Sequence, residues 1–214
     1  MSGARALALD ADGQGVYVGS FSAGVVERRD RAGELTWRDP DVGPVDALFS
    51  PRPGELWVAS ATGEVRMYRD GDLLFTIGDF TRPVAFASVA GNRILVLDHD
   101  AREVRAFDYA GFPMGSTGAI FTDPTDIEGD GEGGAWVADA GRGGLVRIDA
   151  GLLETSLLPA PGALGVTWDS REGILWVAGE GHVRRFLPDG TRLSDRSVGS
   201  RPIKVALFHE GSSR

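Results

Sequence analysis

The ten residues Asp130-Gly-Glu-Gly-Gly-Ala-Trp-Val-Ala-Asp139 place a glycine-rich turn directly before a short apolar run that begins at residue 135. Similar runs begin at residues 16, 56, 94 and 175, so successive runs start 40, 38, 41 and 40 residues apart. A turn rich in Gly precedes each run, and Gly supplies the positive φ that tight connections between strands require. A repeat of this length and regularity predicts an array of equivalent structural units.

Each apolar run has extended stretches on both sides of it. The stretch that follows alternates apolar and polar residues, as in Glu64-Val-Arg-Met-Tyr68, which is the period of a half-buried strand. The stretch that precedes often opens with Pro, as at Pro44 and Pro124, and a strand tolerates Pro at its first residue. A fourth stretch, such as residues 73–77, follows a further turn. The unit therefore contains four predicted strands, and no segment shows a sustained helical period.

The second strand of each unit decides between two all-β architectures. It is apolar on both faces, so both faces must be covered, and radial stacking of four-stranded units does this. A sandwich would show a cleaner alternation in its central strands. We therefore predict an all-β chain, a single β-propeller domain over residues 1–214 with antiparallel blades. The five blades are expected at approximately 4–39, 44–78, 82–118, 123–158 and 162–199.

Residues 201–208 match the opening strand of a sixth unit whose other strands the sequence lacks. A ring of five blades, a homodimer that covers the seam and a longer natural chain would each account for this extra strand. We favour the homodimer, because a twofold contact buries both seams at once.

The composition narrows the class of protein. The net charge is −9 without a basic stripe, which argues against a nucleic-acid partner. Cysteine is absent, so disulfides and thiolate metal sites are excluded. No apolar run is long enough for a signal peptide or a membrane span, so a soluble, cytoplasmic protein is expected.

Two stretches resemble NHL repeats, and the resemblance extends over residues 4–208. The stretches are residues 82–115, with Ile94-Leu-Val-Leu-Asp98 and Val104-Arg-Ala-Phe-Asp108, and residues 123–149. The chain is also similar to the wider six-bladed propeller superfamily, which has gluconolactonase-like and streptogramin-lyase-like members. The resemblance implies the fold and leaves the function open, because this scaffold hosts ligand binders, protein scaffolds and enzymes. Ser20, Ser60 and Gly179 stand where the pattern usually has Asp.

The candidate site residues lie in loops that a propeller presents on one face. The loop before the first strand and the loop after the second strand project from the same face, which we call the channel face. The candidates there are Asp46, Asp98, His99, Asp126, Asp139, Glu180 and Lys204. For Asp98 and Asp139 we favour a structural role, because an Asp at a strand end caps turn amides. Asp46 and Asp126 are interpreted as equivalent first-strand positions and as the best polar pair.

Other sequence features give no evidence for a catalytic or metal-binding site. There is no Gly-x-Ser-x-Gly elbow, the glycine turns are too short for phosphate loops, and the three His residues show no local metal spacing. Trp57, Trp136 and Trp176 are interpreted as packing residues of the blades. Four arginines are assigned to one third-strand position, with ion pairs between blades as their default role; they are Arg66, Arg105, Arg147 and Arg184.

Two functions follow as hypotheses. The favoured one is a non-catalytic binding or scaffolding propeller that needs no cofactor and recognises a protein or small-molecule ligand on the channel face. It is favoured because the channel position is Ala85 or Gly165 in other blades, and because no general base is identifiable. The alternative is a divalent-metal-dependent lyase or lactone hydrolase, with Ca²⁺ or Mg²⁺ at Asp46 and Asp126, since these ions prefer oxygen ligands.

Overall fold

The computed structural model describes residues 3–199 and 204. These residues form twenty strands, β1 to β20. Helix is limited, within this part of the chain, to the 3₁₀ turn η1 (Ala140–Arg142), so none of the described helix is long enough to span a bilayer. The chain divides into two compact units, of which the first ends at Ile120 and the second begins at Phe121.

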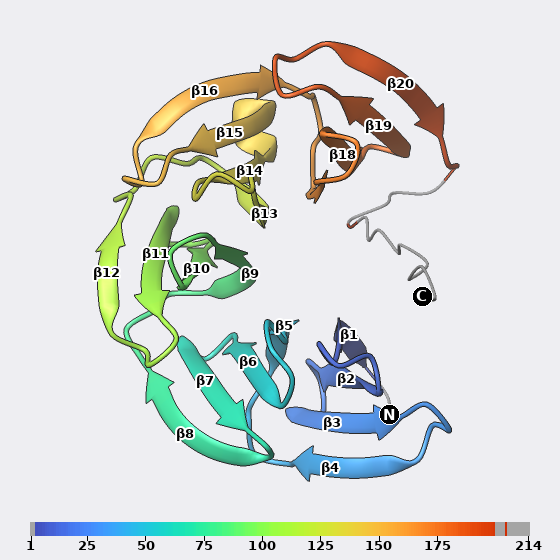
Figure 1. Cartoon of the computed structure of the whole chain (residues 1–214), viewed down its shortest axis with the longest axis vertical. Helices are drawn as coiled ribbons and strands as arrows, with labels where there is room; N and C mark the ends of the chain where they lie inside the picture. Colours follow the sequence, from blue (N-terminus) through green and yellow to red (C-terminus); the bar gives the residue numbers. More distant parts are fainter. Residues whose placement is uncertain (1–2, 200–203, 205–214) are drawn as a thin grey trace. The chain divides into compact units, whose positions relative to one another are not determined.

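The first unit contains three four-stranded antiparallel sheets, each made of strands consecutive in sequence (Figure 1). The strands of the first sheet are β1 (Ala4–Leu9), β2 (Gly15–Ser20), β3 (Val25–Asp30) and β4 (Leu35–Asp39). Those of the second are β5 (Val45–Phe49), β6 (Glu55–Ser60), β7 (Glu64–Arg69) and β8 (Asp72–Ile77). Those of the third are β9 (Pro83–Val89), β10 (Arg93–Asp98), β11 (Glu103–Asp108) and β12 (Pro113–Ser116).

The second unit contains two sheets of the same construction (Figure 1). The strands of one are β13 (Pro124–Gly129), β14 (Ala135–Asp139), β15 (Gly144–Ile148) and β16 (Glu154–Pro159). Those of the other are β17 (Gly165–Asp169), β18 (Ile174–Gly179), β19 (His182–Phe186) and β20 (Arg192–Ser197). The predicted all-β fold with five four-stranded antiparallel blades is confirmed. The extra strand expected at residues 201–208 lies outside the described residues, apart from Lys204.

The second strands are buried as their apolar sequences predict. Every residue of β6 and of β14 is buried, and Trp57 and Trp136 are 0% and 2% exposed. Trp176 on β18 is only partly buried. Within each unit, neighbouring sheets pack face to face, and their first strands contact one another: β1 with β5, β5 with β9, and β13 with β17. One shared core, for example, joins Trp57 to Phe86 and Ile94 of the next sheet.

Three of the four arginines named above have the same role, which is not an ion pair between blades. Arg66, Arg105 and Arg184 pair with Val58, Val96 and Val177 of the second strand, whereas Arg147 pairs with Trp136 and so occupies a different position. Each of the three donates an Nη1–H to a carbonyl of the loop that leads into its own sheet. The acceptors are Asp41 at 2.9 Å, Asp79 at 3.1 Å and Pro161 at 2.7 Å. The default role in ion pairs between blades is therefore wrong for these three, because a nearer acceptor lies within their own blade.

Candidate functional site

Asp98 and Asp139, at the ends of β10 and β14, act as caps for backbone amides. Both are buried, at 1% and 0% exposure. Each carboxylate accepts three backbone N–H groups, two from the loop before the first strand and one from the turn after the second. For Asp98 the donors are Thr81 (2.7 Å), Arg82 (2.8 Å) and Ala101 (3.2 Å), and for Asp139 they are Thr122 (2.8 Å), Asp123 (2.9 Å) and Arg142 (3.1 Å). The shared pattern supports the structural role over a ligand-binding one.

His99 and Glu180 lie in turns that follow second strands. His99 Nδ1 is 2.6 Å from Asp100 Oδ1 in the first unit. Glu180, in the second unit, has a φ of 49° between β18 and β19. Its side chain lies against the backbone of Gly162, since a Cβ on that glycine would come within 2.0 Å of Glu180 Cγ. These two residues are therefore held in separate turns of separate units.

Asp46 holds two arginines in the first unit. Its side chain is only 2% exposed, and its two oxygens contact different guanidinium groups. Arg5 Nε lies 3.0 Å from Oδ1, and Arg82 Nε lies 3.3 Å from Oδ2. The arginines come from β1 and from the loop before β9, so one carboxylate of the middle blade links both neighbouring blades. We call Arg5, Asp46 and Arg82 the arginine clamp.

Asp126 is engaged by a cation and by the backbone in the second unit. Its Oδ1 lies 3.1 Å from Lys204 Nζ, and its Oδ2 accepts the Val166 N–H at 3.1 Å. The negative charge of Asp126 raises the pKa of Lys204. Because the side chain of Asp126 is 5% exposed, its charge depends on these partners for compensation.

The register of the first strands shows that Asp46 and Asp126 are not equivalent. Asp126 pairs with Ala138 of β14, whereas the residue that pairs with the matching Ala59 of β6 is Ala47. Asp46 falls at the irregularity between Val45 and Ala47, one residue earlier. The same irregularity lies between Pro124 and Asp126, so the residue that corresponds to Asp46 is Thr125. An alignment on the opening Pro fails because Pro124 pairs with Asp139, whereas the residue that pairs with the matching Ser60 is Val45 and not Pro44. The prediction that the two carboxylates share one position is therefore wrong.

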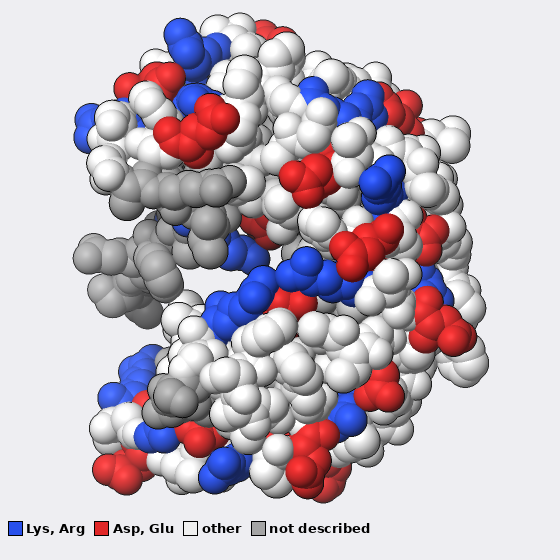
Figure 2. Space-filling model, turned by 180° about the vertical axis from the view of Figure 1, so that it is seen from behind, with Lys and Arg blue, Asp and Glu red and all other residues white. Residues whose placement is uncertain are grey.

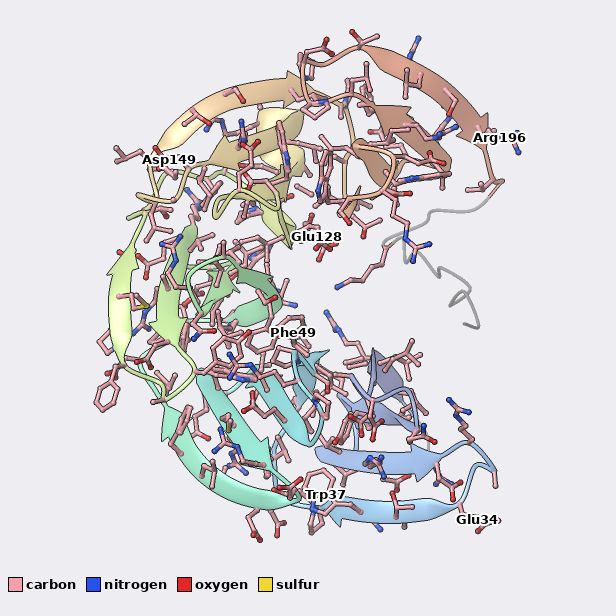
Figure 3. The ribbon with its side chains drawn as sticks, in the orientation of Figure 1. Glu34, Trp37, Phe49, Glu128, Asp149 and Arg196 are labelled. Carbon is pink, nitrogen blue, oxygen red and sulfur yellow. The ribbon has the colours of Figure 1, made fainter. Side chains whose placement is uncertain are left out.

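Glu128 is a site residue that sequence reasoning missed. It lies on β13 two residues after Asp126, and Figure 3 labels it. Burial raises its pKa to about 7, the negative charge of Asp126 adds to the effect, and Lys204 opposes it. Thr167 Oγ1 lies 3.4 Å from its Oε2. An acid with a pKa near neutrality marks a candidate functional position. The sequence signal was a charged residue where the other four first strands carry Ala8, Phe49, Ala87 and Thr167.

The pKa of Glu128 predicts how stability depends on pH. Because burial raises that pKa from 4.5 to about 7, the native state holds the proton more tightly than the unfolded chain does. This stabilising contribution is fully present below pH 4.5 and is lost as the pH rises through about 7. Urea unfolding of the parent and of Glu128→Gln gives the difference between their free energies of unfolding at each pH. This difference should favour the parent more at low pH than at high pH. A difference between the two proteins that stays constant with pH would contradict the assignment.

The donor sets around Asp46 and Asp126 do not fit a divalent cation. Ca²⁺ and Mg²⁺ need six or more oxygen ligands, whereas Asp46 already faces two positively charged side chains and Asp126 faces one and a backbone amide. Across residues 3–199 and 204, no three His, Asp or Glu side chains come close enough together to hold a metal ion.

Comparisons with known proteins agree on the fold. No protein-family model matches the chain, and no curated protein matches it. Its structure is similar to that of virginiamycin B lyase from Staphylococcus aureus, with a TM-score of 0.80 and 15% identity over 95% of this chain and 73% of that one. It is equally similar to the WD40 β-propeller domain of Doa1, with a TM-score of 0.80 and 12% identity over 92% of this chain and 70% of that one. At such identities the likeness shows the fold alone, and that fold is the β-propeller.

Proposed function

We propose that this chain is a non-catalytic binding module that recognises an acidic group of a protein or small-molecule ligand on its channel face. The observation that carries the proposal is the arginine clamp. Two guanidinium groups contact one carboxylate through their Nε atoms, so two positive charges face a single negative one. The Arg5 and Arg82 side chains are 47% and 34% exposed, whereas Asp46 is buried beneath them.

The chemistry of the clamp suits a carboxylate or a phosphate. Guanidinium groups present N–H donors in a planar fork that matches both anions. Arg5 is further held by Phe21, whose ring centroid lies 4.8 Å from the guanidinium carbon. Side chains that are already ordered lose less entropy when a ligand binds. Asp46 and Phe21 therefore prepare the two cations for an anionic partner.

The state of the other carboxylates supports binding rather than catalysis. Asp98 and Asp139 direct their oxygens at backbone amides, and Asp126 is engaged by Lys204 and an amide. Acid–base catalysis needs a group that exchanges protons with the substrate. The predicted carboxylates are already committed to partners within the protein.

Replacement of Arg5 and Arg82 by Gln tests the proposal. The parent protein should bind citrate or a short Glu-rich peptide at constant ionic strength, and its thermal transition should rise by mass action. The double variant should bind at least about ten-fold more weakly, since each charge-assisted hydrogen bond contributes about 1.5–3 kcal/mol. Arg171→Gln, which removes an exposed arginine of the second unit, is the matched control and should bind like the parent.

Two results would refute this proposal. One is equal binding of the acidic peptide and its Gln-rich counterpart, because the clamp should require negative charge. The other is an unchanged affinity in the double variant.

A lyase or lactone hydrolase is the second candidate, and Glu128 is the observation that favours it. A carboxyl group with a pKa of about 7 can donate and accept protons near neutral pH. The metal-dependent form of this hypothesis requires Ca²⁺ or Mg²⁺ to raise the thermal transition of the native protein. A rise that Asp126→Asn abolishes would support it, and the absence of any rise would exclude the metal.

A further inference from the structure

A cavity of about 400 Å³ lies within the first unit, between the first and the second sheet. Its walls include the turns that follow β1, β5 and β7. Asp46 stands at the beginning of β5, whereas Asp10 of the cavity follows the end of β1. The cavity therefore opens at the strand ends opposite to the channel face, and none of the predicted site residues lines it.

Three aromatic side chains form a fixed wall of the cavity. They are Tyr17, Trp37 and Tyr68, and Figure 3 shows Trp37 on β4. Trp37 meets Tyr17 and Tyr68 edge to face, with ring centroids 6.5 Å and 5.2 Å apart. Trp37 Nε1 donates to the Gly71 carbonyl at 3.0 Å, and the Tyr68 hydroxyl donates to Asp39 Oδ2 at 2.6 Å. Because these polar ends are bound by the protein, the rings of Trp37 and Tyr68 offer mainly apolar surface.

Asp10 also lines the cavity, and one of its carboxylate oxygens is buried and accepts no hydrogen bond from the described part of the chain. The residue is 3% exposed, and its Oδ2 accepts the Arg28 Nε–H at 2.8 Å. Its Oδ1 is buried and has no hydrogen-bond partner among the residues that the structure describes. A buried polar atom in this state requires an explanation, and one explanation is a ligand.

The equivalent carboxylate of the fourth blade shows that this is not a general property of the fold. Asp130 also pairs with a third-strand arginine, Arg147, at 2.8 Å. Its Oδ1, in contrast, accepts the N–H groups of Glu132 and Gly134 at 2.8 Å and 2.9 Å.

The difference arises from the length of the turn. Asp130 N–H donates to the carbonyl of Gly134, whereas Asp10 N–H reaches one residue further, to Gly15. In the longer turn Asp12 caps the Gln14 N–H at 2.7 Å. The first blade thereby leaves Asp10 Oδ1 free of the amides that satisfy Asp130.

The charges of the residues that line the cavity determine whether it attracts a cationic or an anionic ligand. Asp10, Asp12 and Asp70 contribute three carboxylates to the cavity, and Arg28 is its one lining cation among the described residues. Arg28 is already bound to Asp10, and this bond raises the pKa of Arg28. Burial, followed by the negative charge of Asp10, raises the pKa of Tyr17, which keeps that phenol neutral. The cavity therefore attracts cations and repels anions.

We infer that this cavity binds a small organic cation, a primary ammonium group carried on a short hydrocarbon body. The ammonium donates to the free oxygen of Asp10 and is attracted by Asp12 and Asp70. The hydrocarbon packs against Tyr17, Trp37 and Tyr68, which also favour a nearby cation through their π faces. A metal ion is the weaker match, because the aromatic rings supply no ligands and no metal-binding group of three acidic residues exists in the described chain. The volume lies within the range of small-molecule sites.

The test uses n-butylammonium as the probe, followed by ¹H–¹⁵N NMR of the tryptophan indoles. The Trp37 indole N–H signal should shift and saturate, with a Kd of about 1 mM, a typical weak affinity for so small a ligand. The other four tryptophans serve as internal controls and should not shift. The uncharged 1-butanol and the anionic butyrate, which have similar carbon chains, should leave the Trp37 signal in place.

Variants locate the binding at Asp10. Asp10→Asn should weaken n-butylammonium at least about ten-fold, since it replaces a charged acceptor by an amide. Asp130→Asn changes the equivalent residue of the fourth blade and should keep the parent affinity. If Asp10→Asn does not fold, Asp70→Asn, on an exposed position of the same lining, is expected to weaken binding a few-fold through charge alone.

Several outcomes would overturn the inference. They are equal shifts with 1-butanol, parent-like affinity in Asp10→Asn, or no saturable shift of Trp37 by n-butylammonium. The Arg5→Gln and Arg82→Gln changes should leave this binding unaltered, so the failure of one proposal can be told from the failure of the other.

Discussion

Replacement of Trp136 by alanine is expected to lower the free energy of unfolding by about 3–5 kcal/mol, the usual range for truncating a buried large aromatic side chain. Trp136 is 2% exposed, and it lies in a core cluster with Leu145, Leu175 and Phe186. Arg147 also lies over its ring, with the guanidinium carbon 5.7 Å from the centroid. Against a typical total stability of about 5–15 kcal/mol, this loss would visibly reduce the fraction of folded protein.

Urea denaturation followed by circular dichroism measures this loss without relying on the deleted fluorophore. Trp168→Ala is the matched control, because Trp168 packs against the same cluster but is only partly buried. Its loss of stability should be clearly smaller. A parent-like transition in Trp136→Ala would mean that the second strand of this blade is not a core element.

Replacement of Asp139 by alanine should cost about 3–5 kcal/mol of stability. Three backbone N–H groups lose a charged acceptor, and each such bond contributes about 1.5–3 kcal/mol before water recovers part of the loss. The bonds also connect the loop before β13 to the end of β14, so this loop should open before the rest of the unit does. Hydrogen exchange at Thr122 and Asp123 measures that local opening.

Asp149→Ala provides the comparison for Asp139. Its Oδ1 also accepts two backbone N–H groups, those of Gly151 and Leu153, but in an exposed turn of the same unit. Water replaces an exposed acceptor readily, so the expected cost is about 1 kcal/mol or less. Equal losses in the two variants would show that the burial of Asp139 does not matter for capping.

The fold could be predicted from the sequence because its information is repeated. The five apolar runs are spaced at nearly constant intervals, and runs such as Leu56-Trp-Val-Ala59 become strands buried on both faces. Each blade therefore supplies independent evidence for the same four strands. The roles of Asp98 and Asp139 could also be anticipated, because capping depends on residues close in sequence to a strand end.

The candidate sites could not be predicted in the same way, because they depend on differences between repeats. The first paired residue is Val45, after the opening Pro, in the second blade but the opening Pro124 itself in the fourth, so Asp46 corresponds to Thr125 and not to Asp126. The pKa of Glu128 depends on Asp126 and Lys204, and no local sequence pattern predicts that Lys204 influences Glu128. The free oxygen of Asp10 results from a turn one residue longer than that of Asp130. This last feature left a signal in the unequal lengths of two similar glycine turns, and Glu128 left one as a charged residue at a first-strand position that is uncharged in the other blades.

The arginine-to-carbonyl bonds described above have a consequence for how such a chain can grow by gene duplication. Each bond joins a third strand to the loop that leads into its own blade, as from Arg66 to Asp41 and from Arg105 to Asp79. A copied segment that begins at the loop carries donor and acceptor together, whereas one that begins at the first strand contains the arginine but leaves its acceptor carbonyl behind. The natural module for duplication, or for building a consensus array, therefore starts about four residues before the first strand, near residues 41 and 79, and not at the opening proline.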